Sequence, residues 1–218
     1  MAEAIELATF NETVISSFEE FWIHIFAVND LTDIRGLTLD EEIIDTLKKL
    51  SLDMKVYYNS TDLDFGPPEI DKYYAVFDDE WHRVRCTSLD SKKEVATVYF
   101  IDRGDEDSFS YDVLHPLHQH FFQFPAQSLK LSICDLEIFK DCKEIQTFIE
   151  ETLVNKDVFV RVKNVNQDCD IPTLSVEMIV EKDSEDEINF NDQVFEKLCD
   201  EVLNPKIHIG TVSMACRL

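Results

Sequence analysis

Hydrophobic side chains recur at two different periods near the N-terminus, which predicts a strand followed by a helix. Over residues 13–26, the apolar side chains of Phe21, Ile23 and Ile25 alternate with their neighbours, and β-branched and aromatic residues dominate, which favours a strand. The segment 40–50 has helical spacing instead, with apolar positions at Ile43, Ile44, Leu47 and Leu50. Thr38 and Glu41 have the spacing of a capping box, so we expect Thr38 to cap this helix.

A polar stretch over residues 59–71 separates this pair of elements from a run of short strands. It contains Pro67 and Pro68, and adjacent prolines cannot continue a helix or a sheet, so an internal boundary is predicted here. The predicted strands that follow cover residues 73–77, 81–89 and 95–101, with a fourth at 108–113. Turn residues separate them at the spacing of a small antiparallel barrel.

The last part of the chain predicts a second mixed arrangement. A strand at 128–134 leads to a helix at 142–154 and then to a hairpin of residues 158–165 and 174–180. Apolar positions still recur within the acidic segment 183–201, which indicates a docked helix. The predicted fold class is α+β, mostly β: the segments on either side of the all-β insert resemble the two parts of one split fold.

The net charge of the chain limits the classes of partner that it is expected to bind. Its 218 residues include 20 Lys plus Arg against 45 Asp plus Glu, a formal net charge of −25. Such a surface repels nucleic-acid phosphates and anionic lipid, and it favours cationic partners. The plain alternative is that the charge only keeps the protein soluble. A hydrophobic content of 44%, with 16 Phe, predicts a folded protein rather than a disordered acidic tail.

Signals for an enzyme, a cofactor or a metal are weak. No GxSxG, HExxH, P-loop or GxGxxG motif occurs. His115, His118 and His120 lie close together and Cys134 follows, but the spacing matches no standard zinc pattern, so a packed loop is expected. The six cysteines are scattered and there is neither a secretory signal nor a membrane span, which favours a cytoplasmic or nuclear protein with reduced thiols.

Three ordered motifs resemble the Tudor domain family. Residues 74–83 read YAVFDDEWHR, similar to the family's A-x-x-x-D-x-x-W-Y-R-A, and residues 98–105 read VYFIDRGD, similar to V-x-F-I-D-Y-G-N. Residues 113–117 and 124–128 resemble L-x-P-L and L-P-x-Q-A. With a further likeness at residues 187–189, the whole chain resembles an extended Tudor domain.

That resemblance implies a Tudor β-barrel inserted into a staphylococcal-nuclease-like, OB-type module without catalytic apparatus. The implied division is 1–66 and 126–204 for the OB-type module with its linker helix, 67–125 for the Tudor barrel, and 205–218 for a C-terminal extension. Extended Tudor domains bind arginine-rich tails of PIWI-clade Argonaute proteins, often symmetrically dimethylated, as scaffolds of germline small-RNA pathways. The resemblance therefore implies a cytoplasmic protein of perinuclear granules that needs no cofactor and binds a peptide between its two halves.

The resemblance also places the binding residues. The four aromatic positions of the family's cage fall on Phe77, His82, Phe100 and Arg103, and its Asn falls on Asp105. Acidic residues expected to support the site are Asp79, Glu80, Asp102 and Glu106. Trp81 is assigned to the core, and Gly104 to a turn position with positive φ. Asp102 is also expected to brace that turn.

His82 and Arg103 stand where the family has aromatic residues, and Asp105 stands where it has Asn. These three departures change the expected ligand. Each aromatic face over a cation contributes about 0.5–2 kcal/mol, so losing two faces weakens a methyl-arginine cage by at least about tenfold. Arg103 adds a positive charge, whereas the Asp105 carboxylate accepts a bidentate hydrogen bond from an unmodified guanidinium. We therefore expect recognition of unmethylated arginine, or binding that ignores methylation. The alternatives are a dimethylarginine reader with a reduced cage, and a structural dimerisation module.

Overall fold

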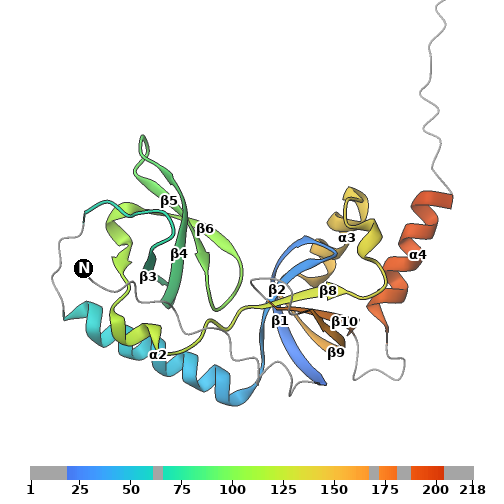
Figure 1. Ribbon diagram of the computed structural model, residues 1–218, viewed down its shortest axis with the longest axis horizontal. Coiled ribbons are helices and arrows are strands. Elements are labelled where there is room, and N and C mark those ends of the chain that lie inside the picture. Colours follow the sequence, from blue (N-terminus) through green and yellow to red (C-terminus); the bar gives the residue numbers. More distant parts are fainter. Residues whose placement is uncertain (1–18, 61–65, 167–171, 181–187, 204–218) are drawn as a thin grey trace, which may run out of the picture.

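The segments on either side of the insert join in one closed five-stranded barrel. The computed structural model describes residues 19–60, 66–166, 172–180 and 188–203, and the barrel lies beside the inserted five-stranded sheet (Figure 1). The strand order of the barrel is β1-β2-β8-β10-β9. Its strands are β1 (Glu20–Asp30), β2 (Asp33–Thr38), β8 (Leu129–Ile133), β9 (Lys156–Asn166) and β10 (Thr173–Ile179). The predicted split fold is therefore confirmed.

Alternation along β1 places its apolar side chains in the barrel. Phe21, Ile23 and Ile25 are buried, whereas Trp22 and Phe26 lie half-buried on the outside. The helices α3 (Lys143–Leu153) and α4 (Phe190–Leu203) complete this core. Their buried side chains are Ile145, Ile149 and Leu153 from α3, and Phe190, Val194 and Leu198 from α4. The acidic helix is therefore docked as predicted, while residues 183–187 of that segment lie outside the described part of the chain.

The insert forms a five-stranded sheet of order β6-β5-β4-β3-β7. The strands are β3 (Tyr73–Asp78), β4 (Glu80–Asp90), β5 (Val95–Phe100), β6 (Glu106–Ser110) and β7 (His115–Pro116). The predicted fourth strand at 108–113 is displaced: β6 ends at Ser110, and a 3₁₀ turn, η1 (Tyr111–Val113), follows it. A second 3₁₀ turn, η2 (Gln119–Phe122), precedes the return to β8, and a third, η3 (Glu137–Phe139), precedes α3.

The helix α2 (Glu41–Asn59) begins one residue later and ends nine residues later than the segment 40–50 predicted. Asp40 is the cap residue, because its carboxylate accepts hydrogen bonds from the backbone N–H groups of Glu42 (3.0 Å) and Ile43 (3.1 Å). The predicted cap, Thr38, is wrong: Thr38 ends β2, and its hydroxyl accepts a hydrogen bond from the backbone N–H of Asp40 (3.3 Å).

Packing against the inserted sheet explains why α2 continues to Asn59. Met54 and Tyr58 are buried in a small core shared with Trp81, which Tyr58 stacks on at 4.9 Å between ring centroids. The Tyr58 hydroxyl donates to the carbonyl of Pro116 (3.0 Å) and accepts from the backbone N–H of His118 (3.1 Å). Burial raises the pKa of Tyr58 to about 12, so this hydroxyl keeps its proton. The helix therefore anchors the sheet.

The three clustered histidines belong to this packed region. His115 lies against Trp81 and Tyr58, and His118 lies against Tyr57. Among the described residues, no group of three or more His, Cys, Asp or Glu side chains is placed to hold a metal ion. Within the same residues, no helix is long and apolar enough to cross a membrane.

Candidate functional site

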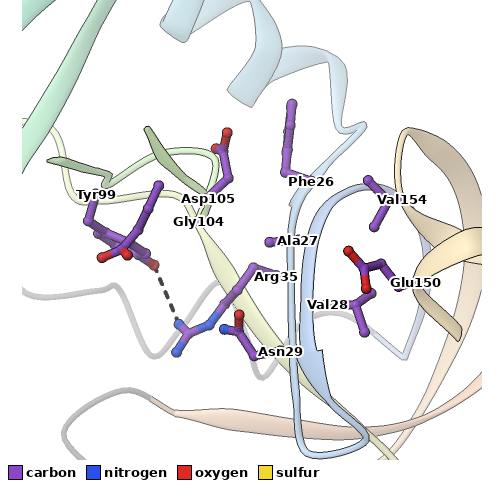
Figure 2. Close-up of a pocket in the computed structure, with 11 residues that line it drawn as sticks. Phe26, Ala27, Val28, Asn29, Arg35, Tyr99, Gly104, Asp105, Glu150 and Val154 are labelled. Carbon is purple, nitrogen blue, oxygen red and sulfur yellow. Dashed lines mark hydrogen bonds between the residues drawn. The ribbon is translucent and has the colours of Figure 1, made fainter. Parts of the chain in front are cut away.

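A groove of about 640 Å³ separates the loop after β5 from the barrel strand β1 and the end of α3 (Figure 2). Its lining residues are Phe26, Ala27, Val28, Asn29, Arg35, Tyr99, Gly104, Asp105, Glu106, Glu150 and Val154. Residues from both the barrel and the inserted sheet form its walls. The groove therefore depends on how these two units are joined.

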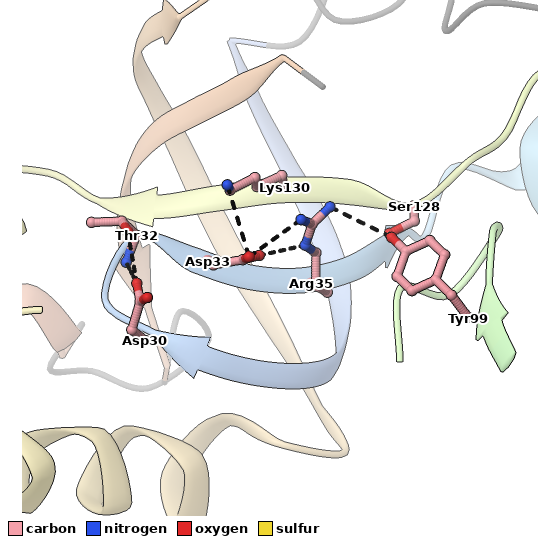
Figure 3. A network of polar contacts seen from close by, with 7 residues as sticks. All are labelled: Asp30, Thr32, Asp33, Arg35, Tyr99, Ser128 and Lys130. Carbon is pink, nitrogen blue, oxygen red and sulfur yellow. Dashed lines mark hydrogen bonds and ion pairs between the residues drawn. The ribbon is translucent and has the colours of Figure 1, made fainter. Parts of the chain in front are cut away.

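A polar network, whose members Arg35 and Tyr99 line the groove, joins the two units (Figure 3). The guanidinium of Arg35 on β2 pairs with Asp33 (Nη2 to Oδ2, 3.3 Å) and reaches the hydroxyl of Tyr99 on β5 (3.5 Å). The Tyr99 hydroxyl in turn donates to Ser128 (3.3 Å), just before β8. Because Arg35 is paired with Asp33, it does not neutralise the carboxylates of Glu106 and Glu150, which also line the groove. The groove therefore favours a cationic ligand.

A tight turn after β5 brings the predicted binding residues together. The backbone N–H of Phe100 donates to the carbonyl of Asp105 (2.9 Å), and the N–H of Gly104 donates to the carbonyl of Phe100 (2.8 Å). Gly104 has a positive φ of +98°, as the sequence predicted, and its α-carbon packs against Arg35 and Ser128. A side chain at this position would collide with both residues. Phe100, Arg103 and Asp105 therefore lie at one corner of the sheet, beside the groove.

The Arg103 guanidinium lies at the centre of this corner. Its Nε and Nη2 donate to the two carboxylate oxygens of Asp105, at 3.0 and 2.5 Å, and its Nη1 donates to Asp78 (3.3 Å). The guanidinium carbon lies 4.1 Å from the ring centroid of Phe100 and 5.1 Å from that of Phe26. We call Phe26, Asp78, His82, Phe100, Arg103 and Asp105 the Arg103 cluster.

His82 completes the cluster beside Phe100 and Asp78. Its ring meets that of Phe100 edge-on at 5.4 Å, and its Nε2 lies 3.2 Å from the carbonyl oxygen of Asp78. Burial, and then the positive charge of Arg103, lower the pKa of His82 below its ordinary value. The cluster therefore holds one cationic guanidinium among aromatic rings and two carboxylates.

The structure brings together four of the five predicted cage residues, but not Phe77. His82, Phe100, Arg103 and Asp105 all belong to the cluster, although Phe100 is only 1% exposed and is part of the sheet's core. Phe77 lies against Trp81 (5.9 Å) beside α2 and is 55% exposed. The turn between β3 and β4 is a single residue, so the alternation of β3 directs the side chain of Asp78 to Arg103 and turns Phe77 away.

The four acidic residues predicted to support the site do not lie together. Asp79 and Glu80 are exposed, and Glu106 lines the groove. Asp102 is buried, and it pairs with Arg83 (Nη2 to Oδ1, 2.6 Å) instead of facing the groove. Asp102 thus belongs to a buried ion pair, and it lines a second, smaller pocket beside Arg103 and not the groove. Sequence reasoning missed Phe26, which no motif marks, and it did not assign Asp78 to the cage, although Asp78 lies within the motif of residues 74–83.

Comparison with known proteins identifies relatives of the chain. The matching family model is that of the Tudor domain, and it covers residues 13–135. The chain is 23% identical over 176 residues to Tudor domain-containing protein 1 of Danio rerio, covering 72% of this chain and 15% of that protein. It is 25% identical over 116 residues to Tudor domain-containing protein 7A of Danio rerio, covering 53% and 11%. The chain thus spans only a small part of the length of these curated relatives.

Solved extended Tudor domains share the fold. Domain TD3 of mouse TDRD1, bound to a MILI peptide containing dimethylarginine, has a TM-score of 0.69 at 14% identity, covering 89% of this chain and 96% of that one. The extended Tudor domain of human TDRD1, bound to a symmetrically dimethylated peptide, has a TM-score of 0.67 at 19% identity, covering 88% of this chain and 92% of that one. The extended Tudor domain of a Drosophila melanogaster Papi variant, bound to an unmethylated Piwi N-terminal peptide, has a TM-score of 0.64 at 18% identity. This match covers 83% of this chain and 97% of that one. The predicted architecture, a Tudor unit inserted into a nuclease-like OB module, is therefore confirmed.

Proposed function

Since this chain belongs to the Tudor domain family, we propose that it binds an arginine-containing peptide in the groove beside the Arg103 cluster, whether or not that arginine is methylated. It is a binding module rather than an enzyme. The observation that carries the proposal is that Phe100, Phe26 and Asp105 already surround a guanidinium group. Side chains that hold one guanidinium have the shape and charge to hold another.

The chemistry of the cluster supports indifference to methylation. Asp105 engages two nitrogens of a guanidinium at once, and methylation preserves the charge while blocking part of this fork. The aromatic contribution is limited to Phe100 and Phe26, with His82 edge-on to Phe100. What methyl groups gain over these rings is offset by the hydrogen bonds they block at Asp105.

The proposed partner is an arginine-rich tail of a PIWI-clade Argonaute protein. Extended Tudor domains of the same fold are bound to MILI and Piwi peptides, and one Piwi peptide is unmethylated. The net charge of −25 suits such a cationic tail. The setting that follows is a scaffold of a germline small-RNA pathway, in the cytoplasm and in perinuclear granules.

Calorimetric titration with an arginine-glycine-rich peptide, unmodified and symmetrically dimethylated, tests this proposal. We expect the two affinities to agree within about threefold, and both to fall as ionic strength rises. Asp105→Ala should weaken binding of the unmodified peptide by at least about tenfold, because it removes a charge-assisted hydrogen-bond pair. Asp107→Ala is the matched control, since Asp107 is exposed on the neighbouring strand.

The other outcomes separate the alternatives. A clear preference for the dimethylated peptide would support the reader with a reduced cage. Failure of both peptides to bind would reject arginine recognition for these tails and favour the dimerisation module, which light scattering over a range of concentrations would detect.

A further inference from the structure

Arg103 belongs to the chain itself, yet it makes the contacts that a bound peptide arginine needs. We propose that Arg103 is an internal ligand: its guanidinium fills the binding site of the free protein, and a peptide arginine binds by displacing it. This inference rests on the proposed function and names the residue that controls affinity and methylation preference at that site.

The position of Arg103 in the turn makes this possible. The residue follows β5 by only three positions, so its side chain folds back over the ring of Phe100 and reaches Asp105 within the same turn. Contacts to Asp78 and Phe26 come from β3 and from the barrel. These contacts occupy the aromatic ring and the carboxylate that would otherwise face an incoming cation.

The surroundings of Arg103 allow it to leave. Its side chain is 21% exposed, so water and an incoming cation can reach it. The cluster lies between two hollows: the groove, which Phe26 and Asp105 line, and a second pocket of about 180 Å³, which Phe26, His82 and Arg103 line. The site can therefore exchange one guanidinium for another without unfolding the sheet.

A tethered competitor lowers the apparent affinity for every peptide. The apparent Kd equals the intrinsic Kd divided by the fraction of molecules in which the site is vacant. If Arg103 is displaced in about a tenth of the molecules, removing its side chain strengthens peptide binding by about tenfold. Arg103→Ala should also expose the rings of Phe100 and Phe26 to a methylated guanidinium, so the variant should gain a preference for dimethylarginine.

Titration of small arginine and lysine derivatives into wild type and into variants that lack the Arg103 side chain tests this inference. N-acetyl-arginine amide, its symmetrically dimethylated form and N-acetyl-lysine amide are titrated by NMR into wild type, Arg103→Ala and Arg103→Gln. We expect both variants to bind the arginine probes at least about tenfold more tightly than wild type, with shifts at Phe26, Gly104 and Asp105. The lysine probe controls for charge, because losing a positive charge alone would strengthen binding of lysine and arginine equally.

Arg161→Ala is the matched control variant, since Arg161 also pairs with a carboxylate, that of Glu20 (2.8 Å), and lies over a ring, that of Phe159, at 6.0 Å. It should bind the probes as wild type does. Equal binding of the arginine probe to wild type and to both Arg103 variants would overturn the inference, as would an equal gain for lysine. If the long peptide fails to bind wild type while the arginine probe binds Arg103→Ala, the proposed function fails and the internal ligand stands. If the long peptide binds wild type and Arg103→Ala equally, the proposed function stands and the internal ligand fails.

Discussion

Two arginine–aspartate pairs lie at the same end of the inserted sheet, and they differ in how far they are exposed to solvent. Asp102 and Arg103 are neighbours in the sequence, but Asp102 turns inward to Arg83, whereas Arg103 turns outward to Asp105. The Arg83 side chain is 0% exposed and that of Arg103 is 21% exposed. One pair is part of the fold, and the other lies beside the groove in which we propose that a peptide binds.

The number of bonds explains the difference. Arg83 makes five hydrogen bonds: two to Asp102, and one to each of the carbonyls of Phe121, Phe124 and Pro125. Asp102 also accepts from the backbone N–H of Gln127 (3.1 Å). This pair therefore fixes the segment that returns from the sheet to the barrel, and its bonds to Asp102 and to the Phe121 carbonyl are buried. Within the described residues, Arg103 donates to the carboxylates of Asp105 and Asp78, whose side chains are 19% and 41% exposed. The two arginines thus differ in burial and in number of bonds, and we propose that a ligand displaces Arg103 and not Arg83.

The largest effect is expected from Arg83→Leu, which leaves the Asp102 carboxylate buried without its partner. Breaking a buried ion pair from one side costs about 3–5 kcal/mol of the free energy of unfolding. Denaturant unfolding of wild type and variant measures this loss. A loss below about 1 kcal/mol would remove the distinction between the two pairs.

Gly104→Ala should have the next largest effect, because it acts on the turn that both pairs share. Its φ of +98° strains any side chain, and the added methyl group would lie 2.6 Å from Cβ of Arg35. We expect a loss of about 1–3 kcal/mol in the free energy of unfolding. Gly66→Ala is the matched control, since nothing lies within 4 Å of its added methyl group. Equal losses for the two variants would contradict this role.

Arg103→Ala should destabilise the protein less than Arg83→Leu does, because the Arg103 pair is partly exposed whereas the Arg83 side chain is 0% exposed. Thermal unfolding of this variant beside Arg83→Leu gives the comparison directly. A loss as large as that of Arg83→Leu would show that Arg103 is a structural residue and not a displaceable one.

The smallest effect concerns the pKa of His82. Burial and the charge of Arg103 lower this pKa, so the folded protein holds the proton less strongly than the unfolded chain does. The resulting stability is complete above the unfolded pKa, about 6.5, and is lost as the pH falls below it. Arg103→Ala should raise the pKa of His82 towards its ordinary value, although burial still lowers it. NMR titration of the His82 ring protons measures this change in pKa. An identical pKa of His82 in both proteins would contradict the contact between His82 and the charge of Arg103.

Local sequence predicted most elements and much of the binding corner. The motif around Phe100, Arg103 and Asp105 lies within one turn, so adjacency in the sequence already meant adjacency in space. Phe26 could not be found in this way, because β1 reaches the turn after β5 only where the inserted sheet packs against the barrel. The strand β2 was also missed, since Asp33, Arg35 and Gly36 interrupt its apolar pattern.

Side-chain direction was the other limit of the sequence. The motif assigned Phe77 to the cage, but a one-residue turn at Asp79 reverses which of Phe77 and Asp78 faces Arg103. Likewise, the residue type showed that Arg103 brings a positive charge, but not that its guanidinium folds back onto Phe100 and Asp105. Both outcomes depend on turn geometry and not on residue type.

The most direct test follows the Nε–H resonance of Arg103 by NMR while wild type is titrated with the unmodified arginine-glycine-rich peptide. We predict that this proton exchanges slowly with water in the free protein, because its nitrogen donates to Asp105. We also predict that this protection is lost at the same peptide concentration at which binding reaches half saturation. A peptide that saturates the groove while the Arg103 resonance and its exchange rate stay unchanged would contradict displacement of Arg103 by the peptide.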